Sequence, residues 1–309
     1  MRRIPVVIDC DPGVDDIAAL LLAKNIEHFD IRAVTTVAGN VPLEDTTRNA
    51  LQLLSFMSWD IPTGRGAEKP LAQRLVTAEE VHGKGGMSGL TLPETYRRAD
   101  AKPAWDLMYD AAREHPGRLD IIALGPLTNL AIALMKYPRL VEWVRRIVIM
   151  GGGILTGNTT PAAEFNIYVD PEAAKRVFTS GIPFYLCPLD VTHEGYVTRE
   201  DIAEIGSFDS KEARFFAEII GRGTEIGKLY TKGRGVALHD PLALLFAADD
   251  SYFTMKECFI DVETGGSLTR GKTVTDCYSD QKMSSNGFLV QGVDRKRFVD
   301  HIKRLLLRY

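Results

Sequence analysis

The chain has 309 residues, of which 45% are hydrophobic and 25% are charged, and its formal net charge is −4. These values exclude disordered, collagen-like and coiled-coil proteins, and they leave a folded chain long enough to bury a large core. Because the charge balance gives no basic field for a phosphate backbone, we expect no nucleic-acid partner.

The cysteines and the N-terminal segment indicate where the protein works. The four cysteines have no Cys-x-x-Cys spacing, which is typical of reduced thiols rather than of a disulfide framework or a zinc site. The apolar run after Arg3 is too short for a signal peptide or a membrane span. We therefore expect a cytoplasmic protein with no membrane partner.

Short β-branched apolar runs alternate with stretches of helical period through about the first 190 residues. The expected strands are Pro5–Asp9, Ile31–Val37, Leu119–Leu124, Ile147–Met150 and Pro183–Cys187. The expected helices are Ile17–Lys24, Leu43–Ser58, Ala104–His115, Thr128–Tyr137 and Pro171–Thr179. This alternation predicts the α/β class, with an open, mostly parallel sheet flanked by helices and a ligand site at the carboxyl ends of its strands.

The rest of the chain departs from this alternation. We expect helices at Thr198–Gly206, Ser210–Lys228 and Pro241–Ala248, β-rich sequence over Thr254–Val290 and a closing helix at Arg295–Leu307. No linker or repeat separates the regions, so we predict a single domain over residues 1–309, with a helical lobe over 190–250. Glycines at 221, 223, 227, 233 and 235 predict either a lid or a poorly ordered surface connection.

Residues Gly266–Thr273 match the phosphate-binding pattern GxxxxGK[ST]. That pattern requires a helix directly after it, whereas the following residues, VTDCY, are β-branched and aromatic. We therefore expect a β-hairpin here rather than a nucleotide-binding loop.

Four carboxylates lie within eight residues, at Asp9, Asp11, Asp15 and Asp16, where the apolar run VVID turns through Pro-Gly into a helix. Like charges at this density repel one another unless a cation or hydrogen bonds compensate them, and a hard divalent cation would do so best. An all-oxygen set favours Ca²⁺ or Mg²⁺ over zinc. Capping of a helix N-terminus would explain Asp15 and Asp16, but it does not explain Asp11.

The stretch DCDPGVDD, residues 9–16, resembles the signature of the inosine-uridine-preferring nucleoside hydrolase family. Further segments resemble that family in the same order: Thr35–Asn40, Val81–Gly83, Gly125–Asn129, Met150–Gly153, Ala163–Asn166 and His239–Pro241. The resemblance extends over nearly the whole chain. It implies a Rossmann-like nucleoside hydrolase architecture and a homo-oligomer, either a dimer or a tetramer.

The resemblance also implies an activity, the Ca²⁺-dependent hydrolysis of the N-glycosidic bond of purine or pyrimidine ribonucleosides, in nucleoside salvage or catabolism. The implied metal ligands are the side chains of Asp11, Asp16 and Asp240 and the carbonyl of Leu124. The implied ribose-binding residues are Asp15, Asn40, Asn158, Glu164 and Asn166.

In the implied mechanism, Asp11 accepts a proton from a metal-bound water that attacks C1′. His239 is the first candidate for protonating the leaving base, because an unperturbed histidine titrates near neutral pH. His82 is the second candidate and would contact the base. Where many family members carry a tyrosine beside the base, this chain has Gly227 and Thr231, with Tyr230 as the nearest aromatic residue.

Two alternatives remain open from the sequence. A metal-dependent protein that binds ribose or a nucleoside without turnover would use the same site. A phosphatase of the haloacid-dehalogenase type would use Asp9 and Asp11 as paired aspartates, but it leaves the residues His239 and Asp240 unexplained.

Overall fold

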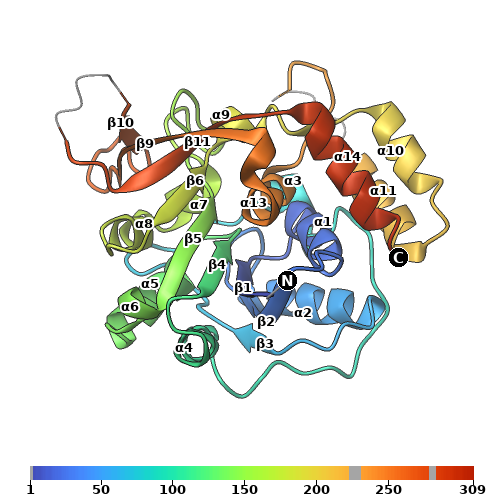
Figure 1. Cartoon of the computed structure of the whole chain (residues 1–309), viewed down its shortest axis with the longest axis horizontal. Coiled ribbons are helices and arrows are strands. Elements are labelled where there is room, and N and C mark those ends of the chain that lie inside the picture. Colours follow the sequence, from blue (N-terminus) through green and yellow to red (C-terminus); the bar gives the residue numbers. More distant parts are fainter. Residues whose placement is uncertain (1–2, 223–230, 278–282) are drawn as a thin grey trace.

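The computed structural model describes residues 3–222, 231–277 and 283–309, and one large sheet crosses this part of the chain (Figure 1). The strand order is β10-β9-β11-β6-β5-β4-β1-β2-β3. The strands are β1 (Ile4–Cys10), β2 (Phe29–Thr36), β3 (Thr63–Arg65), β4 (Leu119–Ala123), β5 (Val144–Met150), β6 (Phe184–Cys187), β9 (Phe253–Val262), β10 (Thr273–Asp276) and β11 (Gly287–Val293). Neighbouring strands from β11 to β3 pair in parallel, whereas β9 is antiparallel to both β11 and β10.

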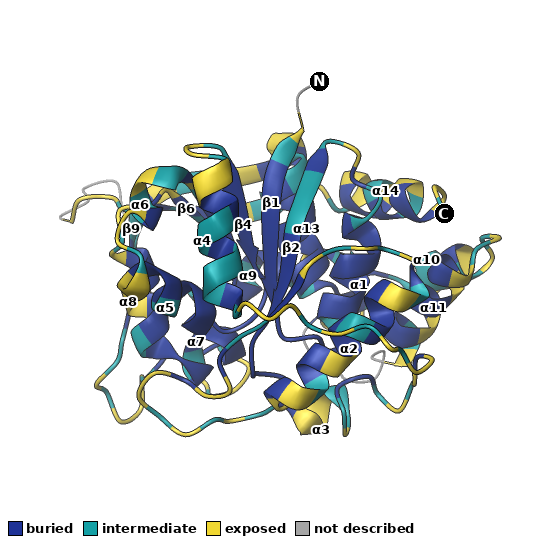
Figure 2. Cartoon of the chain, turned by 90° about the horizontal axis from the view of Figure 1, so that it is seen from below, coloured by how far each residue is buried: buried dark blue, intermediate teal, exposed yellow. Residues whose placement is uncertain are grey.

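Helices cover both faces of the sheet, as expected for parallel strands. They are α1 (Val14–Ala23), α2 (Leu43–Phe56), α3 (Glu79–His82), α4 (Ala104–Glu114), α5 (Thr128–Lys136), α6 (Leu140–Trp143), α7 (Phe165–Val169), α8 (Pro171–Phe178), α9 (Leu189–Thr192), α10 (Arg199–Gly206), α11 (Lys211–Arg222), α13 (His239–Ala248) and α14 (Arg295–Leu306). Val6 and Ile8 point into one hydrophobic cluster with α1 and α13, and Val7 points into the other with α4 and α5. Figure 2 shows β1 and β4 buried between these layers.

The α/β prediction is confirmed, and the structure shifts several element boundaries. The helix expected from Ile17 begins at Val14, because the Asp16 carboxylate accepts the Gly13 backbone N–H and completes the first turn. The strand expected from Ile147 begins at Val144. Short elements such as α3, α7 and α9 carried no periodic signal, because a single turn is too short to show one.

The region expected to form a lid is partly helical. Gly221 lies inside α11 rather than in a mobile segment, and the Thr231 hydroxyl donates to the Gly235 carbonyl at 2.6 Å. Residues 223–230, which include Gly227 and Tyr230, lie outside the described residues, so the lid stays a prediction.

The segment Gly266–Thr273, which matches the phosphate-loop pattern, ends in strand β10, and this confirms the expected hairpin. In the described ranges, no helix is long and apolar enough to cross a membrane.

Candidate active site

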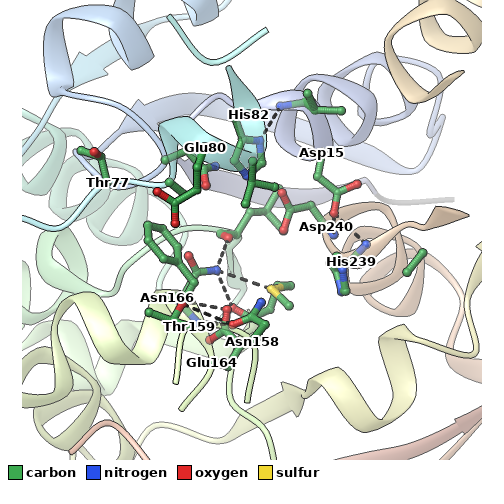
Figure 3. A pocket seen from close by; sticks show the side chains of 18 of the residues that line it. Asp15, Thr77, Glu80, His82, Asn158, Thr159, Glu164, Asn166, His239 and Asp240 are labelled. Atoms are coloured by element: carbon green, nitrogen blue, oxygen red, sulfur yellow. Dashed lines mark hydrogen bonds between the residues drawn. The ribbon is translucent and has the colours of Figure 1, made fainter. Parts of the chain in front are cut away.

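A pocket of about 240 Å³ opens at the carboxyl ends of the parallel strands. Its walls come from segments far apart in the sequence, because parallel strands bring the loops that follow them to one edge. Asp15 lies in the first turn of α1 after β1, Asn40 follows β2, Leu124 follows β4, and Asp240 lies in the first turn of α13. Figure 3 shows Asn158, Glu164 and Asn166 on the opposite wall from Asp15 and His82.

Three carboxylates meet beside the pocket. Asp11, Asp16 and Asp240 are 1%, 0% and 5% exposed, and the charge of Asp16 contributes to the raised pKa of both others. Burial, followed by mutual repulsion, raises the pKa of Asp11 and Asp240 well above the ordinary value. No lysine or arginine contributes to these shifts among the described residues. The cluster is therefore a concentration of carboxylates that backbone N–H groups stabilise only in part.

The surroundings of Asp11 test whether a cation fits there. Its Oδ2 accepts the Asn40 backbone N–H at 2.7 Å, but its buried Oδ1 has no hydrogen-bond partner. A Cβ at Gly39 or Gly125 would come within 2.1 or 2.5 Å of this carboxylate, so both glycines keep space open around it. No three His, Cys, Asp or Glu side chains within the described residues already form a metal-ligand cage. The oxygen donors and the orphaned Oδ1 nevertheless fit a hard cation.

The wall expected to bind ribose presents lone pairs to the pocket. The Asn166 amide group donates to the carbonyls of Leu124 and Met150 at 2.7 and 3.2 Å, and the Asn40 amide group donates to Asp11 and Asp16. Both amides thus turn their NH₂ groups toward the protein and leave Oδ1 as an acceptor. Such a wall suits a ligand that brings several O–H donors.

Glu164 and Asn158 anchor the far end of that wall. The Glu164 carboxylate caps α7 and accepts backbone N–H groups from Gly152, Asn166 and Ile167. Burial raises the pKa of Glu164 above its ordinary value. Asn158 is exposed, and its Oδ1 accepts the Phe165 N–H at 2.9 Å.

Asp15 has a structural contact that the sequence did not indicate. Its Oδ2 accepts the backbone N–H groups of His239 and Asp240 at 2.7 and 3.0 Å. One carboxylate from α1 therefore caps α13 and fixes the two polar residues that begin that helix. Burial raises the pKa of Asp15 to about 7.

Two histidines line the other wall. The Val14 backbone N–H donates to His82 Nδ1 at 3.2 Å, so a neutral His82 carries its proton on Nε2. Desolvation lowers the pKa of His82 to about 4 and that of His239 to about 3. His239 therefore differs from the expectation of an ordinary histidine, because its ring does not titrate near neutral pH.

Several residues that hold the site together were missed from the sequence. The Thr192 hydroxyl lies 2.6 Å from His239 Nδ1. Asn129 and Thr35 both donate to Asp9, which does not line the pocket. Asn49 holds the Pro12 carbonyl at 2.9 Å. Their roles depend on contacts between distant segments, which no local spacing could indicate.

The predicted residues fall into three groups in the structure. Nine line the pocket: Asp15, Asn40, His82, Leu124, Asn158, Glu164, Asn166, His239 and Asp240. Asp11 and Asp16 lie behind the lining, in contact with Asn40. Tyr230 lies outside the described residues.

A parallel α/β fold with buried carboxylates and a lone-pair-lined pocket at its strand ends defines an enzyme that acts on a polyhydroxylated small molecule. Residues 6–300 match the family model of inosine-uridine preferring nucleoside hydrolases. The chain therefore belongs to the inosine-uridine preferring nucleoside hydrolase family. This membership implies a bound metal ion, and it removes the phosphatase alternative.

Known proteins resemble the chain over its full length. It is 41% identical over 308 residues to the pyrimidine-specific ribonucleoside hydrolase RihA of Salmonella enteritidis, covering 99% of both chains. It is 40% identical over 299 residues to the non-specific ribonucleoside hydrolase RihC of Klebsiella pneumoniae, covering 96% of both. The solved plant nucleoside hydrolase PpNRh1 superposes with a TM-score of 0.90 at 32% identity, covering 99% of each chain.

Proposed function

We propose that this enzyme hydrolyses the N-glycosidic bond of ribonucleosides to free base and ribose, with Ca²⁺ as its cofactor. The observation that carries the proposal is the buried cluster of Asp11, Asp16 and Asp240, whose carboxylates repel one another beside an acceptor-lined pocket. The names of RihA and RihC, both ribonucleoside hydrolases, support the substrate class.

The three aspartates, with the Leu124 carbonyl, would hold the cation. When bound, it would offset their charge and orient both the ribose diol and the attacking water. The Leu124 carbonyl already accepts from Asn166, and its second lone pair is available to a further partner. Oxygen donors in this number suit the large, flexible coordination shell of Ca²⁺.

The remaining steps belong to the protein's own side chains. Asp11 accepts the proton of the attacking water, because its Oδ1 is the unpartnered carboxylate oxygen in the cluster. Asp15, Asn40 and Asn166 accept hydrogen bonds from the ribose hydroxyls, and Asn158 and Glu164 hold the 5′-hydroxyl. The concentrated negative charge stabilises the positive charge that develops at C1′ as the bond to the base breaks.

The leaving base needs a hydrogen-bond donor as it gains negative charge. His82 provides Nε2–H, since its Nδ1 is occupied by the Val14 amide. His239 faces the same pocket and is held by Thr192 on one side and by the Asp15 cap on the other. Because both rings are neutral near pH 7, we propose that they assist departure mainly by donating hydrogen bonds.

Three broader expectations accompany this function. We propose that the chain acts as a single domain, because the pocket draws residues from Val14 to Asp240. We also propose a cytoplasmic homo-oligomer of two or four copies, working in nucleoside salvage or catabolism. Light scattering coupled to size-exclusion chromatography measures the number of copies directly.

The test is the release of free base from inosine, adenosine, guanosine, uridine and cytidine, with and without a calcium chelator. We expect release that the chelator abolishes and that added Ca²⁺ restores. Calcium-dependent nucleoside binding with no release from any substrate would instead identify a binding protein without turnover.

A further inference from the structure

Two cysteines outside the proposed chemistry stand opposite each other in the hairpin of β9 and β10. The register pairs Phe259 with Asp276 and Ile260 with Thr275. Extending it by one residue places Cys258 directly across from Cys277.

The hydrogen-bond alternation of the hairpin sets how closely they approach. The Glu263 N–H donates to the Lys272 carbonyl at 2.9 Å, which makes that pair a hydrogen-bonded one. Because hydrogen-bonded and non-hydrogen-bonded pairs alternate along antiparallel strands, Cys258 and Cys277 form a non-hydrogen-bonded pair. Opposed side chains are closest at such positions, with Cα atoms about 4.5 Å apart, within the range that a disulfide can bridge.

The side chains confirm that the two cysteines share one face. Cys258 is fully buried in a hydrophobic cluster, and Cys277 is half-buried and packs against the same cluster. Cys277 is also one of the groups that raise the pKa of the Cys258 thiol, after burial. Lys256 lies two residues before Cys258 on the same strand, and its ammonium group donates to the Cys277 carbonyl.

We propose that Cys258 and Cys277 form an oxidisable dithiol, which a hydroperoxide converts into an intrachain disulfide across the hairpin. In the first step, the Cys277 thiolate attacks one peroxide oxygen; the O–O bond breaks, and Cys277 becomes a sulfenic acid. In the second step, the Cys258 sulfur displaces that oxygen as water and the S–S bond forms. Two thiols and one hydrogen peroxide thus give one disulfide and two waters.

The surroundings decide the order of the two steps. Cys277 is half-buried, so its sulfur can be reached by a small peroxide. Cys258 is inaccessible, and burial raises the pKa of its thiol. Cys277 is therefore the sulfur that reacts first and Cys258 the one that resolves it.

The hairpin also touches the loop that forms the sugar end of the pocket. Lys272 Nζ donates to the carbonyls of Gly153 and Ile154 at 3.0 and 2.6 Å. That loop continues to Asn158 and Glu164 in the pocket wall. A cross-link that restrains the hairpin would therefore also alter the position of this wall. The expected effect on substrate binding rests on the proposed function.

The test treats the full chain with a small excess of hydrogen peroxide and counts free thiols under denaturing conditions. We expect the count to fall from the four of the sequence to two, with a mass loss of about 2 Da and a Cys258–Cys277 peptide in a non-reducing digest. The midpoint of thermal unfolding should rise by about 5 °C and return after reduction.

Matched variants separate the pair from the other thiols. Cys277→Ser should keep all three of its remaining thiols, whereas Cys187→Ala, which removes a buried cysteine elsewhere, should still lose two. Adducts on Cys277 with Cys258 still free, or disulfide-linked dimers, would overturn the proposal. These readouts hold whether or not the protein cleaves a nucleoside.

The link to the pocket has its own readout. We expect oxidation to change the KM for a cleaved ribonucleoside at least threefold in the wild type and to leave it unchanged in Cys277→Ser. An unchanged KM in the oxidised wild type would refute the link. If the reduced wild type cleaves no nucleoside, the proposed function fails instead.

Discussion

Buried carboxylates lie at both edges of the parallel sheet, near the start of strand β4 and past the end of its neighbour β1. They have basic partners at the first edge and none at the second among the described residues. Asp120, near the start of β4, is fully buried and accepts hydrogen bonds from Arg145 Nε and Arg146 Nε at 2.6 and 2.9 Å. Past the other end of β1, Asp11 and Asp16 are equally buried and have no basic partner among the described residues.

The difference separates structural charge from functional charge. At Asp120 the fold supplies its own cations, so the interaction is complete without a ligand. At the carboxyl ends of the strands, Asp11, Asp16 and Asp240 repel one another, and only a ligand from solution can compensate this repulsion. We therefore expect substitutions at the two ends to separate activity from stability.

The largest expected effect is the loss of activity when a carboxylate at the carboxyl ends of the strands is replaced. Asp11→Asn should lower kcat by on the order of 10³ or more, because an amide cannot accept the proton of the attacking water. Its free energy of unfolding without metal should stay equal or increase, because one of the repelling charges is gone. Base release and urea unfolding measure the two quantities. A variant within tenfold of wild-type kcat would show that Asp11 is not the base.

Removing a hydroxyl from the substrate tests the same end without changing the protein. We expect kcat/KM for deoxyuridine to be about 10³ below that for uridine, because acceptors such as Asn40 and Asn166 and the cation would lose a partner. Parallel assays of the two nucleosides measure the ratio. Comparable turnover would count against recognition of the ribose diol.

The opposite end should respond in stability instead. Asp120→Asn should lower the free energy of unfolding by about 3 kcal/mol, because two arginines lose their shared carboxylate. Arg145 is 42% exposed and Arg146 is 14% exposed, so most of the loss comes from Arg146. The kcat of the folded variant should match the wild type. A loss of activity without a loss of stability would reverse the assignment of the two ends.

Calcium should stabilise the folded protein only through the acidic cluster of Asp11, Asp16 and Asp240. At a Ca²⁺ concentration of 100 times its dissociation constant, the free energy of unfolding should rise by about 2.7 kcal/mol. Asp16→Asn should abolish this gain, because one of the three proposed carboxylate ligands would lose its charge. Asp120→Asn, with its intact acidic cluster, should retain it. Thermal unfolding with chelator and with Ca²⁺ distinguishes these cases.

The two ends also differ in how much the sequence could reveal. The sequence predicted the parallel α/β alternation and the density of aspartates over residues 9–16, because both are local patterns. It could not pair Asp240 with Asp11 from spacing, and that assignment came from the family resemblance. The two arginines of Asp120, the hydroxyl of Thr192 and the amide orientation of Asn166 depend on tertiary contacts, which leave no periodic signal in the sequence.

The smallest expected effect concerns a titratable group of the scaffold. His301 lies on α14, and its Nδ1 is 2.9 Å from the Tyr252 hydroxyl. Desolvation, followed by repulsion from Arg304, lowers the pKa of His301 to about 4, whereas an unfolded histidine has a pKa of about 6.5. Between these values the unfolded chain binds the proton and the folded chain does not, so stability is lost as the pH falls from about 6.5 to about 4.

A variant that lacks only the His301 ring isolates this contribution. Because His301 is only partly buried, solvent screening reduces the effect to about 1 kcal/mol. Urea unfolding at pH 7 and pH 5 should show the wild type losing this much relative to His301→Gln, which has no titrating ring. In the presence of a chelator, Asp15 should act in the opposite direction, because its pKa is raised to about 7 and it binds its proton first in the folded state. Equal pH dependence in the wild type and in His301→Gln would show that His301 does not contribute.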